Sequence, residues 1–149
     1  MKKIYLSVVC LLISIPLIAQ LYVEPEKEVE CSVFLAKEGR GRAQQGLEIW
    51  DDYIFSCEDG GHVNIYDFKS ADPKPVAGFE LASSHPDNHV NNVCFGVETK
   101  RGASFPLLYI TNGKVGSELE WLCFVESITR RGKRFSSEIV QTIELDGSK

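Results

Sequence analysis

Residues 51–68 read DDYIFSCEDGGHVNIYDF, and this stretch decides the fold. Asp-Gly between two strand-like runs is a strong signal for a tight β-hairpin, because both residues tolerate a positive φ. The aromatic and branched side chains of Tyr53–Cys57 and the alternating side chains of His62–Phe68 fit the pleated surface of a sheet. The stretch therefore predicts two antiparallel strands that are joined at Glu58–Gly61.

Further strand-like segments flank this hairpin, and the same order recurs later in the chain. The first unit spans Gly46–Leu81, with GLEIW before the hairpin and PVAGFEL after it. The second unit spans Val90–Leu145 and contains VNNVCFG, FPLLYITNG, ELEWLCFVESI and SEIVQTIEL. No segment shows the apolar spacing of a helix, so no helix is predicted. The sequence predicts an all-β chain with two four-stranded antiparallel units.

The start of the chain has the features of a secretory signal peptide. Lys2 and Lys3 precede the apolar run Ile4–Ala19, which ends at a small residue before polar sequence begins. We predict that residues 1–20 are a signal peptide, and that the protein is a bacterial one exported by the Sec route to the periplasm or the exterior. The alternative is a membrane anchor, but the run contains Pro16 and is short for a span of about 20 residues. No membrane span is expected after cleavage.

The rest of the chain is predicted to form an acidic domain with a short lead-in. Residues 21–45 are expected to be extended with one strand, Val29–Ala36, and residues 46–149 are expected to form the two units. The whole chain has a net charge of −5, which becomes −7 when Lys2 and Lys3 are removed. Because an acidic exported domain binds polyanions poorly, nucleic acid is not an expected partner.

Four cysteines remain after the predicted cleavage: Cys31, Cys57, Cys94 and Cys123. None of them forms a C-x-x-C pair, so neither a metal site nor thioredoxin-type chemistry is expected. Two disulfides could form among them in an oxidising compartment. The favoured interpretation is that Cys57, Cys94 and Cys123, each within an apolar strand, are small buried hydrophobic residues.

The order strand, turn, YIFSCEDGGHVNIYDF, loop, GFEL resembles the blades of exported β-propellers of the six- or seven-bladed NHL and gluconolactonase-like type. The resemblance covers Gly46–Leu145 and implies that each unit is one blade of an incomplete propeller. Two blades alone leave sheet edges and faces exposed to water. The resemblance therefore implies either a truncated member of a longer family, which we favour, or a chain that associates with itself to complete a ring.

One loop is rich in side chains that could contact a ligand. Its sequence is HPDNHVNN, and it leads into the first strand of the second unit. In a propeller this position lies near the central channel, where ligands bind. The predicted ligand-binding residues are His85, Asp87, His89, Asn91 and Asn92. The alternative is structural, with imidazole and amide groups that cap the backbone of adjacent strands.

The leading hypothesis is a non-enzymatic module that binds an unknown ligand or envelope protein, without a cofactor or a metal ion. The spacing Asp87-x-His89-x-Asn91 is similar to a segment of periplasmic arylsulfotransferases, and the similarity implies that His89 is the base or nucleophile and Asn91 its polar support. A group-transfer or hydrolytic enzyme of the arylsulfotransferase or lactonase kind that uses His89 is therefore the alternative hypothesis. The resemblance implies that the further histidines and arginine of such an enzyme come from blades other than the two expected here.

Other polar groups are predicted to have structural roles only. Glu58 and Asp59 are expected to be solvated acids of a tight turn. His62 is expected at the surface or between strands. The four basic residues of the last turn are expected to be solvated, and they are Arg130, Arg131, Lys133 and Arg134.

Overall fold

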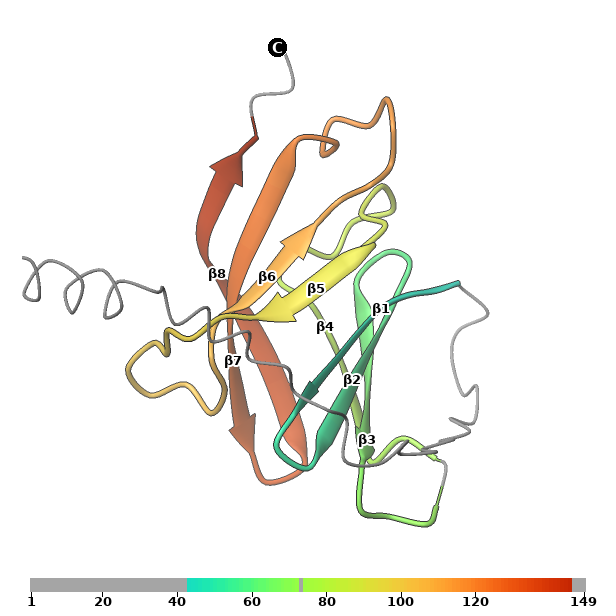
Figure 1. Cartoon of the computed structure of the whole chain (residues 1–149), viewed down its shortest axis with the longest axis vertical. Coiled ribbons are helices and arrows are strands. Elements are labelled where there is room, and N and C mark those ends of the chain that lie inside the picture. The colour runs from blue at the N-terminus through green and yellow to red at the C-terminus, as the bar shows by residue number, and fades with distance from the viewer. Residues whose placement is uncertain (1–42, 73, 146–149) are drawn as a thin grey trace, which may run out of the picture. The chain divides into compact units, whose positions relative to one another are not determined.

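The computed structural model describes residues 43–72 and 74–145, which belong to one compact unit, Val33–Lys149. The described residues contain no helix and form two four-stranded antiparallel sheets (Figure 1). The strands are β1 (Gln44–Trp50), β2 (Tyr53–Glu58), β3 (His62–Asp67), β4 (Ala77–Glu80), β5 (Asn92–Phe95), β6 (Leu108–Thr111), β7 (Leu122–Arg131) and β8 (Arg134–Glu144). We call β1–β4 the first sheet and β5–β8 the second sheet. In each sheet every strand pairs with its neighbour in the sequence.

The all-β prediction and the two four-stranded units are confirmed. The predicted hairpin is present, with Cys57 paired to Val63 on either side of the turn. Gly60 and Gly61 have φ values of 90° and 96°, which only glycine adopts without strain. The predicted signal peptide, the strand Val29–Ala36 and Cys31 lie outside the described residues. In the described part of the chain, no helix is long and apolar enough to cross a membrane.

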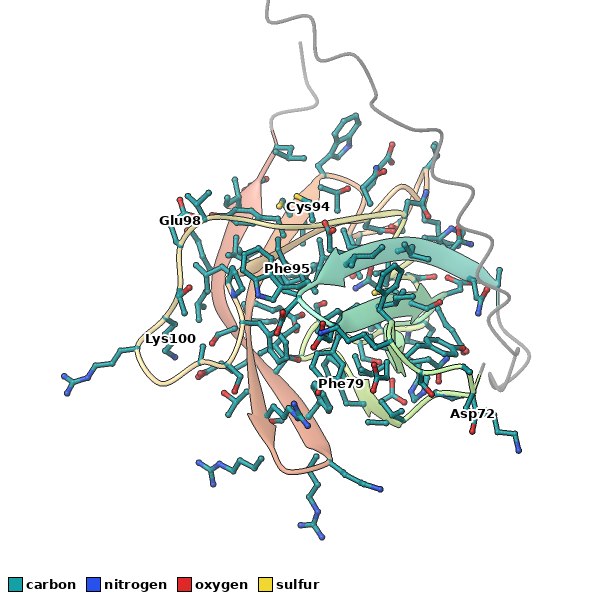
Figure 2. The ribbon with its side chains drawn as sticks, turned by 60° about the horizontal axis from the view of Figure 1, so that its bottom comes forward. Asp72, Phe79, Cys94, Phe95, Glu98 and Lys100 are labelled. Atoms are coloured by element: carbon teal, nitrogen blue, oxygen red, sulfur yellow. The ribbon has the colours of Figure 1, made fainter. Side chains whose placement is uncertain are left out.

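An aromatic cluster fills the space between the two sheets. Phe55 of β2 is fully buried and meets Phe95 and Phe105 edge to face, with ring centroids 5.0 and 5.2 Å apart. Phe79 of β4 stacks on Phe135 of β8 at 6.0 Å. Figure 2 labels Phe79 and Phe95 among the side chains of this core. The side chains of the first hairpin that face the second sheet are therefore buried between the two sheets.

Equivalent strands of the two sheets are in contact. The first strands, β1 and β5, contact each other, and so do the fourth strands, β4 and β8. Glu48 of β1 accepts a hydrogen bond through Oε2 from the backbone N–H of Phe95 at 3.1 Å. A Cβ at Gly46 would lie 2.8 Å from the carbonyl oxygen of Val90 and 2.9 Å from a methyl group of Val93. This close approach of β1 to the chain that enters β5 therefore requires glycine at position 46.

A buried carboxylate binds the connection between the sheets. Glu126 of β7 is fully buried, and its Oε2 and Oε1 accept hydrogen bonds from the backbone N–H groups of Ala82 at 2.9 Å and Ser83 at 2.8 Å. The hydroxyl oxygen of Ser137 accepts a second bond from Ala82 N–H at 2.8 Å. The second sheet thereby holds the first residues of the segment that joins β4 to β5.

The prediction of buried cysteines is confirmed for two residues and wrong for one. Cys57, Cys94 and Cys123 are all free thiols. Cys57 and Cys123 are buried, and burial raises the pKa of the Cys57 thiol to about 12, so this thiol stays protonated and packs as a small hydrophobic group. Cys94 is exposed because it alternates with Val93 and Phe95, which face the core. An apolar run alone does not tell which face of a strand is buried.

Candidate functional site

Three loops meet at one end of the two sheets, which we call the loop end. They are the β2–β3 turn (residues 59–61), the β4–β5 connection (residues 81–91) and the β6–β7 loop (residues 112–121). The backbone N–H of Gly60 in the turn donates to the carbonyl of Asn88 in the connection at 2.7 Å. The candidate residues predicted from the sequence lie in this connection and at the start of β5.

Asp87 and His89 each pair with a different neighbouring loop. The Lys114 ammonium, from the β6–β7 loop, donates to Oδ1 of Asp87. The Nε2 of His89 lies 3.6 Å from Oδ1 of Asp59 in the β2–β3 turn. The backbone N–H of His89 also donates to Oδ1 of Asn112 at 3.0 Å. Both side chains are partly exposed, so the two pairs border the solvent.

The other three predicted residues differ in their surroundings. His85 is exposed, and its Nδ1 accepts a hydrogen bond from the backbone N–H of Asp87 at 3.1 Å. Asn91 packs against Gly113 of the β6–β7 loop, and among the described residues its buried Oδ1 has no hydrogen-bond partner. Asn92 is exposed at the start of β5. The structure therefore brings Asp87, His89 and Asn91 into contact with neighbouring loops, and the backbone N–H of His85 donates to the carbonyl of Gly60 in the β2–β3 turn at 3.2 Å.

Two residues between the predicted ones have structural roles that the sequence did not indicate. Asn88 is fully buried, and its amide donates to the carbonyl of Ser83 at 3.0 Å and accepts from Val90 N–H at 3.1 Å. Val90 is fully buried with a φ of 48°, a conformation that is strained for a β-branched residue. The capping amide of this segment is therefore Asn88, and the backbone beside His89 is strained.

Lys114 and Asn112 are functional candidates that sequence reasoning missed. Asn112 Oδ1 accepts from the backbone N–H groups of His89 at 3.0 Å and Lys114 at 3.2 Å, and its Nδ2 donates to the Ser117 hydroxyl at 2.9 Å. The sequence predicts only a connection between two strands at this place. Topology could have pointed to these two residues. In each unit, the turn after the second strand lies at the end of the sheet from which the chain leaves for the next unit.

The turn that faces this segment also differs from expectation. Glu58 was predicted to be a solvated acid, but it is fully buried and accepts a hydrogen bond from Asn64 Nδ2 at 2.7 Å. The reason is that Glu58 is the last residue of β2, so its side chain lies on a face of the sheet. His62 is confirmed between strands, with Nδ1 3.0 Å from Oε1 of Glu80. Within residues 43–72 and 74–145, no three His, Cys, Asp or Glu side chains are grouped to hold a metal ion.

The pairing with Lys114 lowers the pKa of the Asp87 carboxyl, first through the hydrogen bond and then through the positive charge. We expect Lys114→Gln to raise the pKa of Asp87 toward the ordinary value of an aspartate. A ¹³C NMR titration of the side-chain carboxyl measures this change. Lys100→Gln is the matched control, because the Lys100 ammonium pairs with Glu138 at 2.8 Å. The Asp87–Lys114 pair would be contradicted if Lys114→Gln left the titration midpoint of Asp87 unchanged while Lys100→Gln moved it.

The sequence matches no protein-family model, and a search of curated proteins gave no significant match. The function is therefore inferred from the residues and geometry of the chain itself.

Proposed function

We propose that this protein is a non-enzymatic binding module that uses the loop end to hold a polar ligand. The observation that supports this most is that Asp87 and His89, two positions apart, pair with charged groups from two different loops. These groups differ in sign and offer both donors and acceptors. Such a surface suits a ligand with several hydroxyl or amide groups, such as a glycan, better than a polyanion.

The strained backbone at Val90 gives further support. Strained backbone is concentrated at binding sites, where the surrounding structure holds residues in position for a ligand. The positive φ of Val90 lies directly between His89 and Asn91. Asn91 also has a buried Oδ1 that no hydrogen bond satisfies within the described part of the chain.

We further propose that the two sheets are propeller-type blades of an exported protein similar to the NHL and gluconolactonase-like propellers. The contacts of β1 with β5 and of β4 with β8 support this, because stacked blades bring equivalent strands together. Leu47 and Ile49 of β1 are 56% and 45% exposed, which supports further blades beside the first sheet, from a longer relative or from second copies of the chain. The loop end would then be the ligand-binding end of the blades.

A thermal-shift screen of the full chain against glycans and polar metabolites tests the proposal. A ligand of the loop end should raise the melting temperature, because it binds the folded state only. We expect Asp87→Asn and His89→Gln to weaken the binding of each hit by about tenfold or more, since each removes a charge-assisted contact. Asp72→Asn is the control, because Asp72 is exposed in the β3–β4 connection (Figure 2). A panel without any hit, or hits that all three variants weaken equally, would overturn the proposal.

The His89–Asp59 pair favours one alternative, an enzyme in which His89 is the base or nucleophile. A carboxylate 3.6 Å from Nε2 can orient the imidazole ring. Turnover of an aryl sulfate ester or a lactone by the wild type, with loss of turnover in His89→Ala, would replace the binding proposal with this one. Ligand binding without turnover would support the binding module.

A further inference from the structure

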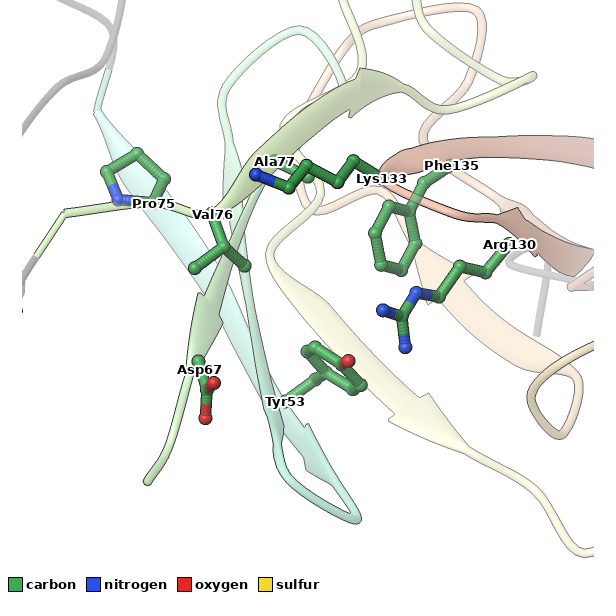
Figure 3. Close-up of a pocket in the computed structure, with 8 residues that line it drawn as sticks. All are labelled: Tyr53, Asp67, Pro75, Val76, Ala77, Arg130, Lys133 and Phe135. Carbon is green, nitrogen blue, oxygen red and sulfur yellow. The ribbon is translucent and has the colours of Figure 1, made fainter. Parts of the chain in front are cut away.

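A pocket of about 350 Å³ lies at the end of the sheets opposite the loop end, where β2 and β4 begin and β7 turns into β8 (Figure 3). We call this the hairpin end. The first sheet and the β7–β8 hairpin each contribute part of the wall. The lining residues are Tyr53, Asp67, Pro75, Val76, Ala77, Arg130, Lys133 and Phe135. None of them belongs to the candidate site at the loop end.

Arg130 is fixed in this pocket by three contacts. Its guanidinium carbon lies 4.9 Å from the ring centre of Tyr53 and 5.7 Å from that of Phe135. Its Nε donates to the carbonyl of Gly132 at 2.8 Å, which leaves the two terminal NH₂ groups without an acceptor among the described residues. In Figure 3 the guanidinium group extends from the hairpin toward Tyr53. A planar cation held in one orientation on aromatic rings is suited to two-pronged binding of a carboxylate.

The charges of the wall favour an anion, and its apolar part favours an organic body. Lys133 adds a second cation from the same hairpin, and no carboxylate pairs with it or with Arg130 in the described part of the chain. The one acid of the lining, Asp67, accepts a hydrogen bond from the backbone N–H of Lys69 at 2.9 Å, and in Figure 3 it lies across the pocket from Arg130. Val76, which is 45% exposed, provides an apolar surface beside the cations.

We propose that this pocket binds a small organic carboxylate, with the carboxylate on Arg130 and an aromatic or aliphatic body against Val76 and Phe135. Arg130 supplies paired N–H donors, and Lys133 supplies additional positive charge. The volume is at the lower end of the range of ligand pockets, which is about 300–1,000 Å³, so the ligand is small. This site is independent of the proposed function of the loop end.

The test is an NMR titration of the full ¹⁵N-labelled chain with phenylacetate and with the neutral phenylacetamide. We expect phenylacetate to shift the amide signals of the pocket residues, and phenylacetamide to bind at least about tenfold more weakly because it lacks the charge. Arg130→Gln should weaken phenylacetate binding by about tenfold or more. Arg131→Gln should leave it unchanged, because Arg131 is on the same strand but does not line the pocket.

A further variant keeps the result interpretable if Arg130→Gln fails to fold. Lys133 is exposed on the turn, so Lys133→Gln should fold normally and weaken phenylacetate binding by about twofold to fivefold. Any one of three results overturns the proposal. The first is that phenylacetamide binds as tightly as phenylacetate, and the second is that Arg130→Gln and Arg131→Gln weaken phenylacetate binding equally. The third is that the pocket signals do not shift at phenylacetate concentrations up to about 10 mM.

Discussion

Replacing Glu126 with alanine is expected to lower the free energy of unfolding by about 3–5 kcal/mol. The carboxylate accepts hydrogen bonds from the backbone N–H groups of Ala82 and Ser83 while it is fully buried. Bonds to a charged acceptor contribute about 1.5–3 kcal/mol each, and a buried N–H without a partner adds a further penalty. Part of this loss of stability is offset, because the alanine variant no longer buries a charged carboxylate. The hydroxyl of Ser137 still accepts from Ala82, so Ser83 is the group most affected.

Chemical denaturation with urea measures this effect, and Glu138→Ala is the matched control. Glu138 lies on the adjacent strand, but its side chain is exposed and pairs with Lys100 at the surface, so its removal should cost less than about 1 kcal/mol. Glu126→Gln should lower the free energy of unfolding by an intermediate amount. The amide keeps one acceptor oxygen but directs an NH₂ group at the other N–H donor. Equal losses in Glu126→Ala and Glu138→Ala would show that the buried carboxylate does not fix the connection.

The positions of the strands could be predicted because their signals are local. Alternation of side chains and the glycines of a tight turn act within a few residues, so the hairpin around Gly60 was located correctly. The ends of the last hairpin were less well predicted. Pairing continues through polar sequence beyond the expected limits, with Thr129 opposite Ser136 and Arg130 opposite Phe135. The backbone bonds of a ladder do not require apolar side chains, so composition alone ends β7 too early and starts β8 too late.

The candidate site could be predicted only in part because its contacts join distant segments. The connection that contains Asp87 and His89 was identified from its polar composition. Its partner Lys114 could not be identified, because that pairing depends on which loops share one end of the packed sheets. The same applies to the hairpin end, where the ring of Tyr53 and the guanidinium of Arg130 come from different sheets. Register and sheet packing decide these contacts, and neither is encoded in a local pattern.

Replacing Phe55 with alanine is expected to destabilise the fold by about 3–5 kcal/mol, because it removes a fully buried ring from the centre of the core. The ring contacts Phe95 and Phe105 edge to face, and its centre lies 6.5 Å from that of Phe135. These partners all belong to the second sheet or to the loop within it, so the cavity would open between the two sheets. Edge-to-face pairs add about 0.5–1.5 kcal/mol each beyond the buried area, which places the loss toward the upper end of the range.

Phe68→Ala is the matched control for this substitution. Phe68 follows the same hairpin but is 44% exposed, so its loss should cost less than about 1 kcal/mol. Urea denaturation of both variants, with near-ultraviolet circular dichroism of the aromatic groups, measures the difference. Phe55→Leu fills most of the cavity and should recover part of the stability, because a smaller void costs less. If Phe55→Ala and Phe68→Ala unfold at the same urea concentration, the two sheets do not share one packed core, and neither the loop end nor the hairpin end is held together as a site.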